Sequence, residues 1–161
     1  MILVEAKFYP YLLMAFQGTG HTEAEYRAMF TATEAVGRRA LAEKTKYVCI
    51  SVSGGNMSAA ERKLVAALME ESPKELEAAS LRSFVIAESA VFRGVLTALR
   101  WISPRFATVT PVASIDVAMT GAEADLREND IRFDPGSTPR VRQWLEQQIA
   151  LQRRTPSVSP P

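Results

Sequence analysis

The heptapeptide Lys46 to Val52, KYVCISV, predicts the centre of the fold. Its residues are mostly apolar without clean alternation, which is typical of a strand covered on both faces inside a sheet. Ser53 to Asn56 follows as a turn. Ser58 and Glu61 then match a capping box, in which each side chain bonds a backbone N–H at the start of a helix. The stretch therefore predicts a central strand that leads into a helix.

The segments on either side predict the rest of a sheet. Ile2 to Phe8 alternates apolar and polar residues, and Tyr11 to Gln17 resumes an alternating pattern after the break at Tyr9-Pro10. These two runs predict an antiparallel β-hairpin. Leu81 to Ala87 predicts a further strand, and Ala107 to Val112 predicts a weaker last one. The sheet is therefore expected to have four or five strands.

Helices are expected between and after these strands. Thr22 with Glu25 forms a second capping box, directly after the hairpin. Ser89 and Ser114 are the expected N-caps of two more helices, and Thr138-Pro139 begins a last amphipathic one. Helices that alternate with strands across short loops predict an α/β fold, with a mixed sheet and helices packed on it. Right-handed crossovers would make the later strands parallel.

The chain has 161 residues, of which 47% are hydrophobic and 23% are charged. This is the usage of an ordinary globular protein, so residues 1–153 are expected to form a single domain. The core of that domain spans 1–126, and an extra C-terminal helix covers about 138–152. Residues 155–161 are rich in Ser and Pro and are expected to be disordered.

Charge and cysteine content narrow the class of protein. Nineteen Lys and Arg residues against 18 Asp and Glu residues give a formal net charge of +1. A nucleic-acid-binding protein usually shows a basic face, so no nucleic-acid partner is expected. Cys49 is the single cysteine and lies in the central strand, where it is expected to be a buried core residue. No apolar run is long enough for a transmembrane segment and no basic region typical of a secretory signal begins the chain, so the cytoplasm is the expected location.

The sequence lacks the residue sets that catalysis and metal binding require. His21 is the only histidine, and no second histidine or neighbouring cysteine could share a metal with it. Gly18 to His21 lacks the Gly-Lys-Ser/Thr ending of a phosphate-binding loop, and no Gly-x-Ser-x-Gly elbow is present. We therefore expect a non-catalytic protein without a cofactor or a metal ion.

The segments Arg82 to Ile86 and Arg93 to Trp101, preceded by the hairpin, resemble small bacterial STAS-like proteins of the SpoIIAA-like group. These are relatives of the anti-sigma factor antagonists and of the cytoplasmic domains of sulfate transporters, and the likeness covers roughly residues 1 to 126 as an order of elements. The resemblance implies a mixed sheet with helices mainly on one face. It also implies a regulatory or scaffolding role, with a protein partner bound at the loop after the third strand and at the following helix.

In the anti-sigma factor antagonists that region carries a phosphorylated Ser, so Ser58 and Ser53 are the candidate phosphorylation sites here. Val52 stands where the antagonists have an Asp, which departs from their pattern. The loop can equally be a plain turn followed by a helix cap. The partner-binding residues that the resemblance implies are Ser53, Gly54, Gly55, Asn56, Met57 and Ser58.

The predicted helix from Ala90 to Ile102 has two apolar faces, of which only one can pack on the sheet. The C-terminal helix could cover the second face, and a buried Trp144 would favour that arrangement. A homodimer or a protein partner could cover it instead. The interface candidates are Arg93, Gly94, Trp101 and Trp144.

An alternative function is that of a carrier or sensor for an apolar small molecule. STAS-like relatives without the phosphorylated Ser also resemble lipid-binding folds of the CRAL-TRIO type. A ligand would lie between the sheet and the helices, where a well-formed cavity would favour this hypothesis and a solid core would argue against it. The expected lining residues are Met14, Phe16, Met29, Phe30, Phe92 or Leu96.

Overall fold

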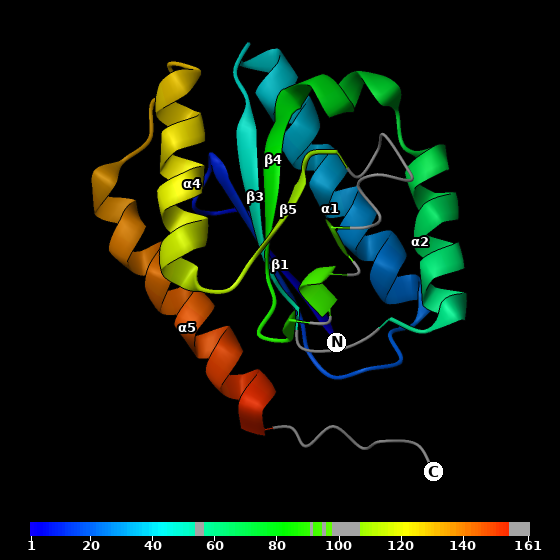
Figure 1. Cartoon of the computed structure of the whole chain (residues 1–161). Helices are drawn as coiled ribbons and strands as arrows, with labels where there is room; N and C mark the ends of the chain where they lie inside the picture. Colours follow the sequence, from blue (N-terminus) through cyan, green and yellow to red (C-terminus); the bar gives the residue numbers. More distant parts are fainter. Residues whose placement is uncertain (54–56, 91, 95, 98–106, 155–161) are drawn as a thin grey trace.

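The structure is a computed structural model, and it describes residues 1–53, 57–90, 92–94, 96–97 and 107–154. Within these residues the chain forms one five-stranded sheet between two layers of helices (Figure 1). The strands are β1 (Ile2–Glu5), β2 (Tyr11–Phe16), β3 (Tyr47–Ser53), β4 (Ser80–Ile86) and β5 (Val109–Val112).

The strands lie in the sheet in the order in which they occur in the sequence. β1 pairs with β2 antiparallel, whereas β2, β3, β4 and β5 are parallel to their neighbours. The expected α/β class, the initial hairpin and the central position of Lys46 to Val52 are thereby confirmed. The first strand ends at Glu5 and not at Phe8, because the chain turns there: the N–H of Tyr9 donates to the carbonyl of Ala6 (3.2 Å).

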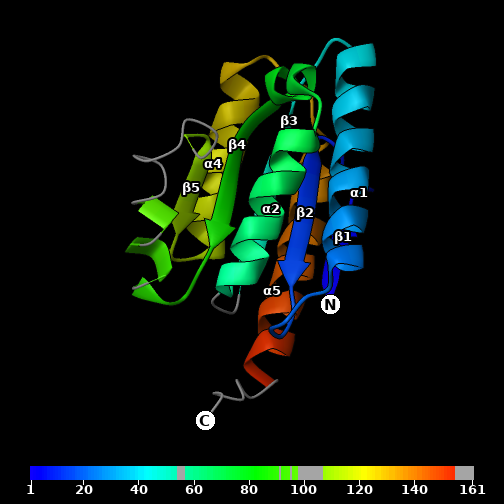
Figure 2. The ribbon, with the colours of Figure 1, turned by 90° about the vertical axis from the view of Figure 1, so that its right-hand side faces the viewer.

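One layer of helices contains α1 (Glu23–Ala42), α2 (Ala59–Glu71) and the short 3₁₀ helix η1 (Lys74–Ala79). Figure 2 shows α1 and α2 in front of the sheet. Both predicted capping boxes are present, so these two helices begin where the sequence places them. After β4, the described residues 90, 92–94 and 96–97 are helical, and the N–H of Phe92 donates to the Ser89 hydroxyl (3.3 Å) as expected of an N-cap.

The second layer contains α4 (Ile115–Glu128), the 3₁₀ turn η3 (Pro135–Ser137) and α5 (Thr138–Arg154). Both helices lie on the sheet face opposite α1 and α2 (Figure 1). The resemblance implied helices mainly on one face, and the structure differs because α4 and α5 bury their own apolar stripes against the other face. The carboxylate of Asp125 on α4 accepts hydrogen bonds from the guanidinium of Arg82 on β4, which ties that layer to the sheet.

The two faces of the sheet differ in the size of their side chains. The face toward α4 and α5 carries large apolar residues that are almost fully buried, and their rows are in register across β2, β3 and β4. These residues are Leu13, Val48, Ile50, Val52, Phe84 and Ile86. The face toward α1 and α2 has a second buried apolar cluster, to which Leu12, Met14 and Tyr47 belong. Beside these it carries small side chains, namely Cys49, Ser51, Ser53 and Ser83. The first face is therefore a filled core, and the second leaves space above the strands.

Candidate functional site

A cavity of about 430 Å³ occupies the space between the small-residue face of the sheet and the layer of α1 and α2. We call it the α1–α2 cavity. It is partly open to solvent, and its lining is mostly apolar in area. All six side chains that the sequence suggested for an apolar ligand line it: Met14, Phe16, Met29, Phe30, Phe92 and Leu96.

The floor of the cavity follows from the alternation of side chains along the strands. In β3 the residues Val48, Ile50 and Val52 point to the filled core, so Cys49 and Ser51 must point to the other face. In the sheet, Ser51 is paired with Met14 on β2 and with Val85 on β4, and all three line the cavity. Because the middle residue of this row is a serine, the helices above it meet no bulky side chain at the centre of the floor.

One wall of the cavity comes from a single face of α1. Tyr26, Met29, Phe30 and Thr33 are three or four residues apart, so they lie on the same side of the helix. The capping box at Thr22 begins the helix and so sets the position of this face. Tyr26 and Met29 are buried, with Tyr26 fully excluded from solvent.

A buried carboxylate, Glu61, lies at one end of the cavity and joins three segments of the chain. Its Oε2 accepts a hydrogen bond from the backbone N–H of Ser58 (2.8 Å). Its Oε1 accepts hydrogen bonds from the backbone N–H of His21 (3.0 Å) and from the hydroxyl of Tyr26 (3.3 Å). Only 8% of Glu61 is exposed. The sequence predicted Glu61 as a helix cap, but its bonds to His21 and Tyr26 depend on tertiary packing that no local pattern reveals.

These contacts alter the pKa values of the groups around Glu61. Burial alone would raise the pKa of Glu61, but hydrogen bonds from Ser58, His21 and Tyr26 outweigh it, and the pKa lies below the usual 4.5. Burial, with the nearby carboxylate of Glu61, raises the pKa of Tyr26 to about 12. Burial, with the N-terminal ammonium of Met1 at 3.2 Å from its Nδ1, lowers the pKa of His21 below its usual 6.5. At neutral pH this end of the cavity therefore holds a carboxylate beside an uncharged imidazole and an uncharged phenol.

Aromatic rings surround the same end of the cavity. The ring centroids of Phe16 and His21 are 6.0 Å apart, and those of His21 and Tyr26 are 5.9 Å apart in an edge-to-face arrangement. All three residues line the cavity together with Glu61. We call these four residues the Glu61 cluster.

Cys49 lies in the cavity floor and is a buried core residue, as predicted. Burial raises the pKa of its thiol to about 12, and a hydrogen bond with Ser83 acts in the opposite direction. At neutral pH the side chain is therefore a thiol and not the thiolate that nucleophilic chemistry needs.

The predicted partner-binding loop contributes to the cavity wall. Ser53 and Met57 line the α1–α2 cavity. Ser58 is the N-cap of α2, and its hydroxyl accepts a hydrogen bond from the N–H of Glu61 (3.1 Å). The remaining partner-binding candidates, Gly54, Gly55 and Asn56, lie outside the described residues.

The surroundings of Ser58 and Ser53 do not resemble a phosphate-binding site. The carboxylate of Glu61 already bonds the N–H of Ser58, so a phosphate on that hydroxyl would stand beside a negative charge. Ser53 is half-buried in the cavity wall, where a phosphate would lose most of its hydration. Phosphorylation at either position stays a prediction.

The four interface candidates do not form one surface within the described residues. The guanidinium of Arg93 donates to the carbonyls of Ala87 (2.6 Å) and Glu88 (2.8 Å), so it stabilises the turn before its own helix. Gly94 is exposed, and Trp101 lies outside the described residues. Trp144 is half-buried on α5, which packs beside α4 on the opposite face of the sheet from the cavity. Of the second apolar face of the helix that begins at Ala90, only Gly94 is described, so its cover by α5 or by a partner stays a prediction.

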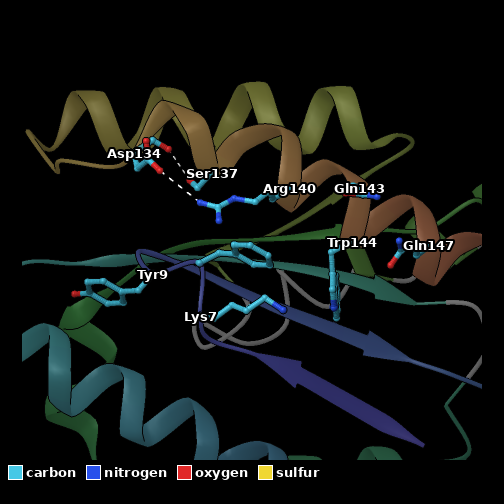
Figure 3. Close-up of a pocket in the computed structure, with 9 residues that line it drawn as sticks. Lys7, Tyr9, Asp134, Ser137, Arg140, Gln143, Trp144 and Gln147 are labelled. Carbon is cyan, nitrogen blue, oxygen red and sulfur yellow. Dashed lines mark hydrogen bonds and ion pairs between the residues drawn. The ribbon is translucent and has the colours of Figure 1, made fainter.

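A second hollow of about 580 Å³ lies between the β1–β2 hairpin and α5 (Figure 3). Figure 3 shows Trp144 and Arg140 reaching from α5 toward the hairpin, with Lys7 on the other side. Both cations have carboxylate partners, since Arg140 pairs with Asp134 (3.6 Å) and Lys7 with Glu5 (2.6 Å). This groove is more polar than the α1–α2 cavity, and its charges are already neutralised.

Neither a metal-binding cluster nor a membrane-spanning helix is found in the part of the chain that the structure describes. No group of three or more His, Cys, Asp or Glu side chains there is arranged to hold a metal ion. No helix there combines the length and the apolar character needed to cross a membrane.

The chain was compared with protein-family models, with curated proteins and with solved structures, and none of the three comparisons found a match.

Proposed function

We propose that this protein binds an apolar small molecule in the α1–α2 cavity and acts as a carrier or sensor, without catalysing a reaction. The observation that carries the proposal is the contrast between the two sheet faces. One face is packed with large aliphatic residues, whereas Cys49, Ser51 and Ser83 leave the other face open beneath a wall of methionines and aromatic rings.

The size and lining of the cavity support this proposal. Binding pockets for small molecules are typically about 300–1,000 Å³ and mostly apolar with a few polar groups, and the α1–α2 cavity of about 430 Å³ fits that description. Methionine side chains such as Met14 and Met29 adapt their shape to a ligand because they are unbranched and flexible. A protein interior without a ligand-binding role would ordinarily be close-packed at this position.

The non-catalytic part of the proposal rests on the chemistry of the cavity. The described lining offers Cys49 with a thiol pKa of about 12 and Tyr26 with a phenol pKa of about 12, so neither is ionised at neutral pH. The main-chain N–H of His21 donates to Glu61, and the imidazole lies between two other aromatic rings with its Nδ1 3.2 Å from the N-terminal ammonium of Met1. These side chains are suited to binding and orienting a ligand, and none of them is prepared to act as a nucleophile.

A protein partner at the loop after β3 stays a prediction, and one observation connects it with the cavity. Ser53 and Met57 belong both to the predicted partner-binding residues and to the cavity wall. A ligand in the cavity would therefore contact the same loop that a protein partner would bind.

The test uses the uncharged fluorescent probe N-phenyl-1-naphthylamine, whose emission rises in an apolar site. The wild-type protein should give saturable binding. Ser51→Leu and Ser83→Leu each place a bulky side chain on the cavity floor from a different strand, so each should weaken probe binding at least about tenfold. Thr120→Leu adds similar bulk to the exposed face of α4 and should leave probe binding unchanged.

Thermal unfolding followed by circular dichroism checks that the variants fold. Wild-type affinity in a folded Ser51→Leu or Ser83→Leu variant would show that the probe binds elsewhere. A wild-type protein without saturable probe binding would contradict the proposed function as a whole.

A further inference from the structure

Glu61 is a buried carboxylate that no cation among the described residues bonds directly. The N-terminal ammonium of Met1 lies nearby, 3.2 Å from the Nδ1 of His21, but its own ionic partner is Glu25 (3.2 Å). The partners of Glu61 among the described residues are backbone N–H groups and hydroxyls, from Ser58, His21 and Tyr26. Carboxylates are almost never this buried unless they are paired with a positive charge. The hydrogen bonds keep Glu61 ionised, and the N-terminal end of α2 adds a favourable partial charge, but no ammonium or guanidinium group among the described residues forms an ion pair with it.

The rest of the described lining has the same sign of charge. Glu34 also lines the cavity, and no Lys or Arg is among the described lining residues. The carboxylate of Glu34 forms an exposed ion pair with the guanidinium of Arg38 (3.8 Å), so the charge of Glu34 is partly neutralised. His21 adds no positive charge at neutral pH, because burial lowers its pKa. An anionic head group, such as the carboxylate of a fatty acid, would therefore be repelled by these walls.

The aromatic rings beside Glu61 favour a cation independently of its charge. Phe16, His21 and Tyr26 lie side by side, with adjacent centroids 5.9–6.0 Å apart. Ammonium groups are attracted to the faces of aromatic rings, and the attraction is strongest where water is excluded. A buried carboxylate and several rings at one end of an apolar cavity provide both interactions that a desolvated ammonium group needs.

We propose that the ligand of the α1–α2 cavity is an amphipathic cation, whose ammonium head lies at the Glu61 cluster and whose apolar body lies along Met14, Met29 and Phe92. This inference rests on the proposed function, since it names the chemical class of ligand that the same cavity takes. The apolar body explains the methionines and aromatic residues of the walls. The ammonium head supplies a direct ionic partner for Glu61, which none of the described residues provides.

The test compares three ligands that share one alkyl chain and differ only in the head group: decylamine, decanol and decanoate. Each is titrated against the wild-type protein with N-phenyl-1-naphthylamine bound, at neutral pH and below its micellar concentration. Decylamine should displace the probe at about a tenfold lower concentration than decanol, and decanoate should be the weakest of the three.

Two substitutions connect this preference with the Glu61 cluster. Glu61→Gln removes the charge and should reduce the preference for decylamine over decanol to about twofold or less. Phe16→Leu keeps the carboxylate and removes one ring, and it should reduce the preference by a smaller factor. Glu146→Gln makes the same chemical change at an exposed position of α5, on the opposite face of the sheet from the cavity, and should leave the preference unchanged.

The outcomes separate this inference from the proposed function. Equal displacement by decylamine and decanol, or stronger displacement by decanoate, would overturn the cationic ligand while probe binding still supported an apolar cavity. A full preference for decylamine in folded Glu61→Gln protein would also overturn it. If Glu61→Gln does not fold, the wild-type series and Phe16→Leu decide the question.

Discussion

Glu61 combines a structural task with the chemical one proposed for it. Its carboxylate caps α2, holds the loop before α1 through the N–H of His21, and accepts the hydroxyl of Tyr26. These bonds join segments up to 40 residues apart in the sequence. A single side chain therefore fixes the relative position of the two helices that form the cavity wall.

Replacing Glu61 should destabilise the protein in a pH-dependent way. Glu61→Gln removes an acceptor from bonded donors, which typically costs about 1–3 kcal/mol at neutral pH. The pKa of Glu61 is lower in the folded protein than its usual 4.5, so its contribution to stability is fully present above that value. The contribution is lost as the pH falls through the folded-state pKa.

Urea denaturation of wild-type and Glu61→Gln protein at pH 7 and at about pH 3 measures this difference. We expect a clear gap between the two free energies of unfolding at pH 7 and a smaller gap at the acidic pH. Equal gaps at both pH values would mean that the charge of Glu61 contributes nothing to stability.

Sequence patterns recovered part of the site at the level of single residues. Ser58 and Glu61 were recognisable as a capping box because that motif is local. The six apolar lining residues followed from the expected faces of strands and helices. The role of Tyr26 as a partner of Glu61 was not predictable, because their contact spans 35 residues and depends on how two helices pack.

At the scale of whole elements, helix starts were predicted better than strand ends. Thr22, Ser58 and Ser114 all cap helices as expected, since capping depends on a few neighbouring residues. The predicted end of β1 was wrong, because Lys7 and Phe8 continue the alternating pattern in the sequence although the backbone has already turned. The placement of α5 opposite the cavity was also missed, since amphipathicity indicates that a helix packs but not on which face.

Gly121 in α4 interrupts the helical pattern for a reason that only the structure reveals. A Cβ at this position would stand 2.5 Å from the ring of Phe84, which is buried in the filled core. Gly121→Ala should therefore destabilise the protein by about 1–3 kcal/mol through overpacking, although Ala favours helices more than Gly does.

Gly37→Ala in α1 is the matched control, because the added Cβ would meet Leu76 at an ordinary 3.4 Å. This variant should be neutral or stabilising by up to about 1 kcal/mol. Chemical denaturation of both variants gives the comparison. Equal stability of the two would show that α4 can move away from the sheet without cost.

At the scale of the whole molecule, the sheet divides the protein into a filled half and an open half. The filled half, between the sheet and α4 with α5, contains large aliphatic side chains from three strands. The open half contains the α1–α2 cavity. The sequence correctly indicated a central strand covered on both faces. It offered a ligand site between sheet and helices as an alternative, but it did not indicate that Cys49 and Ser51 form the floor of that site, because both were interpreted only as members of a buried strand.

Ligand binding should stabilise the molecule as a whole. A compound that binds only the folded state adds about 2.7 kcal/mol to stability at a concentration of one hundred times its Kd. For a domain of this length, that corresponds to a rise in Tm of roughly 5–10 °C. Decylamine at such a concentration should produce this shift in wild-type protein and a much smaller one in Ser51→Leu, as measured by scanning calorimetry. Equal shifts in both proteins would indicate binding outside the cavity.

The alternation of side chains along β3 also has a consequence for how the protein can diversify. Substitutions at Cys49, Ser51 or Ser83 alter the volume of the cavity from positions that face away from the aliphatic core. The volume of the cavity and the packing of the filled core are thus determined by alternate residues of the same strands. Selection, natural or in a directed-evolution library, can enlarge, shrink or repolarise the cavity in single mutational steps while the core between the sheet and α4 with α5 stays unchanged.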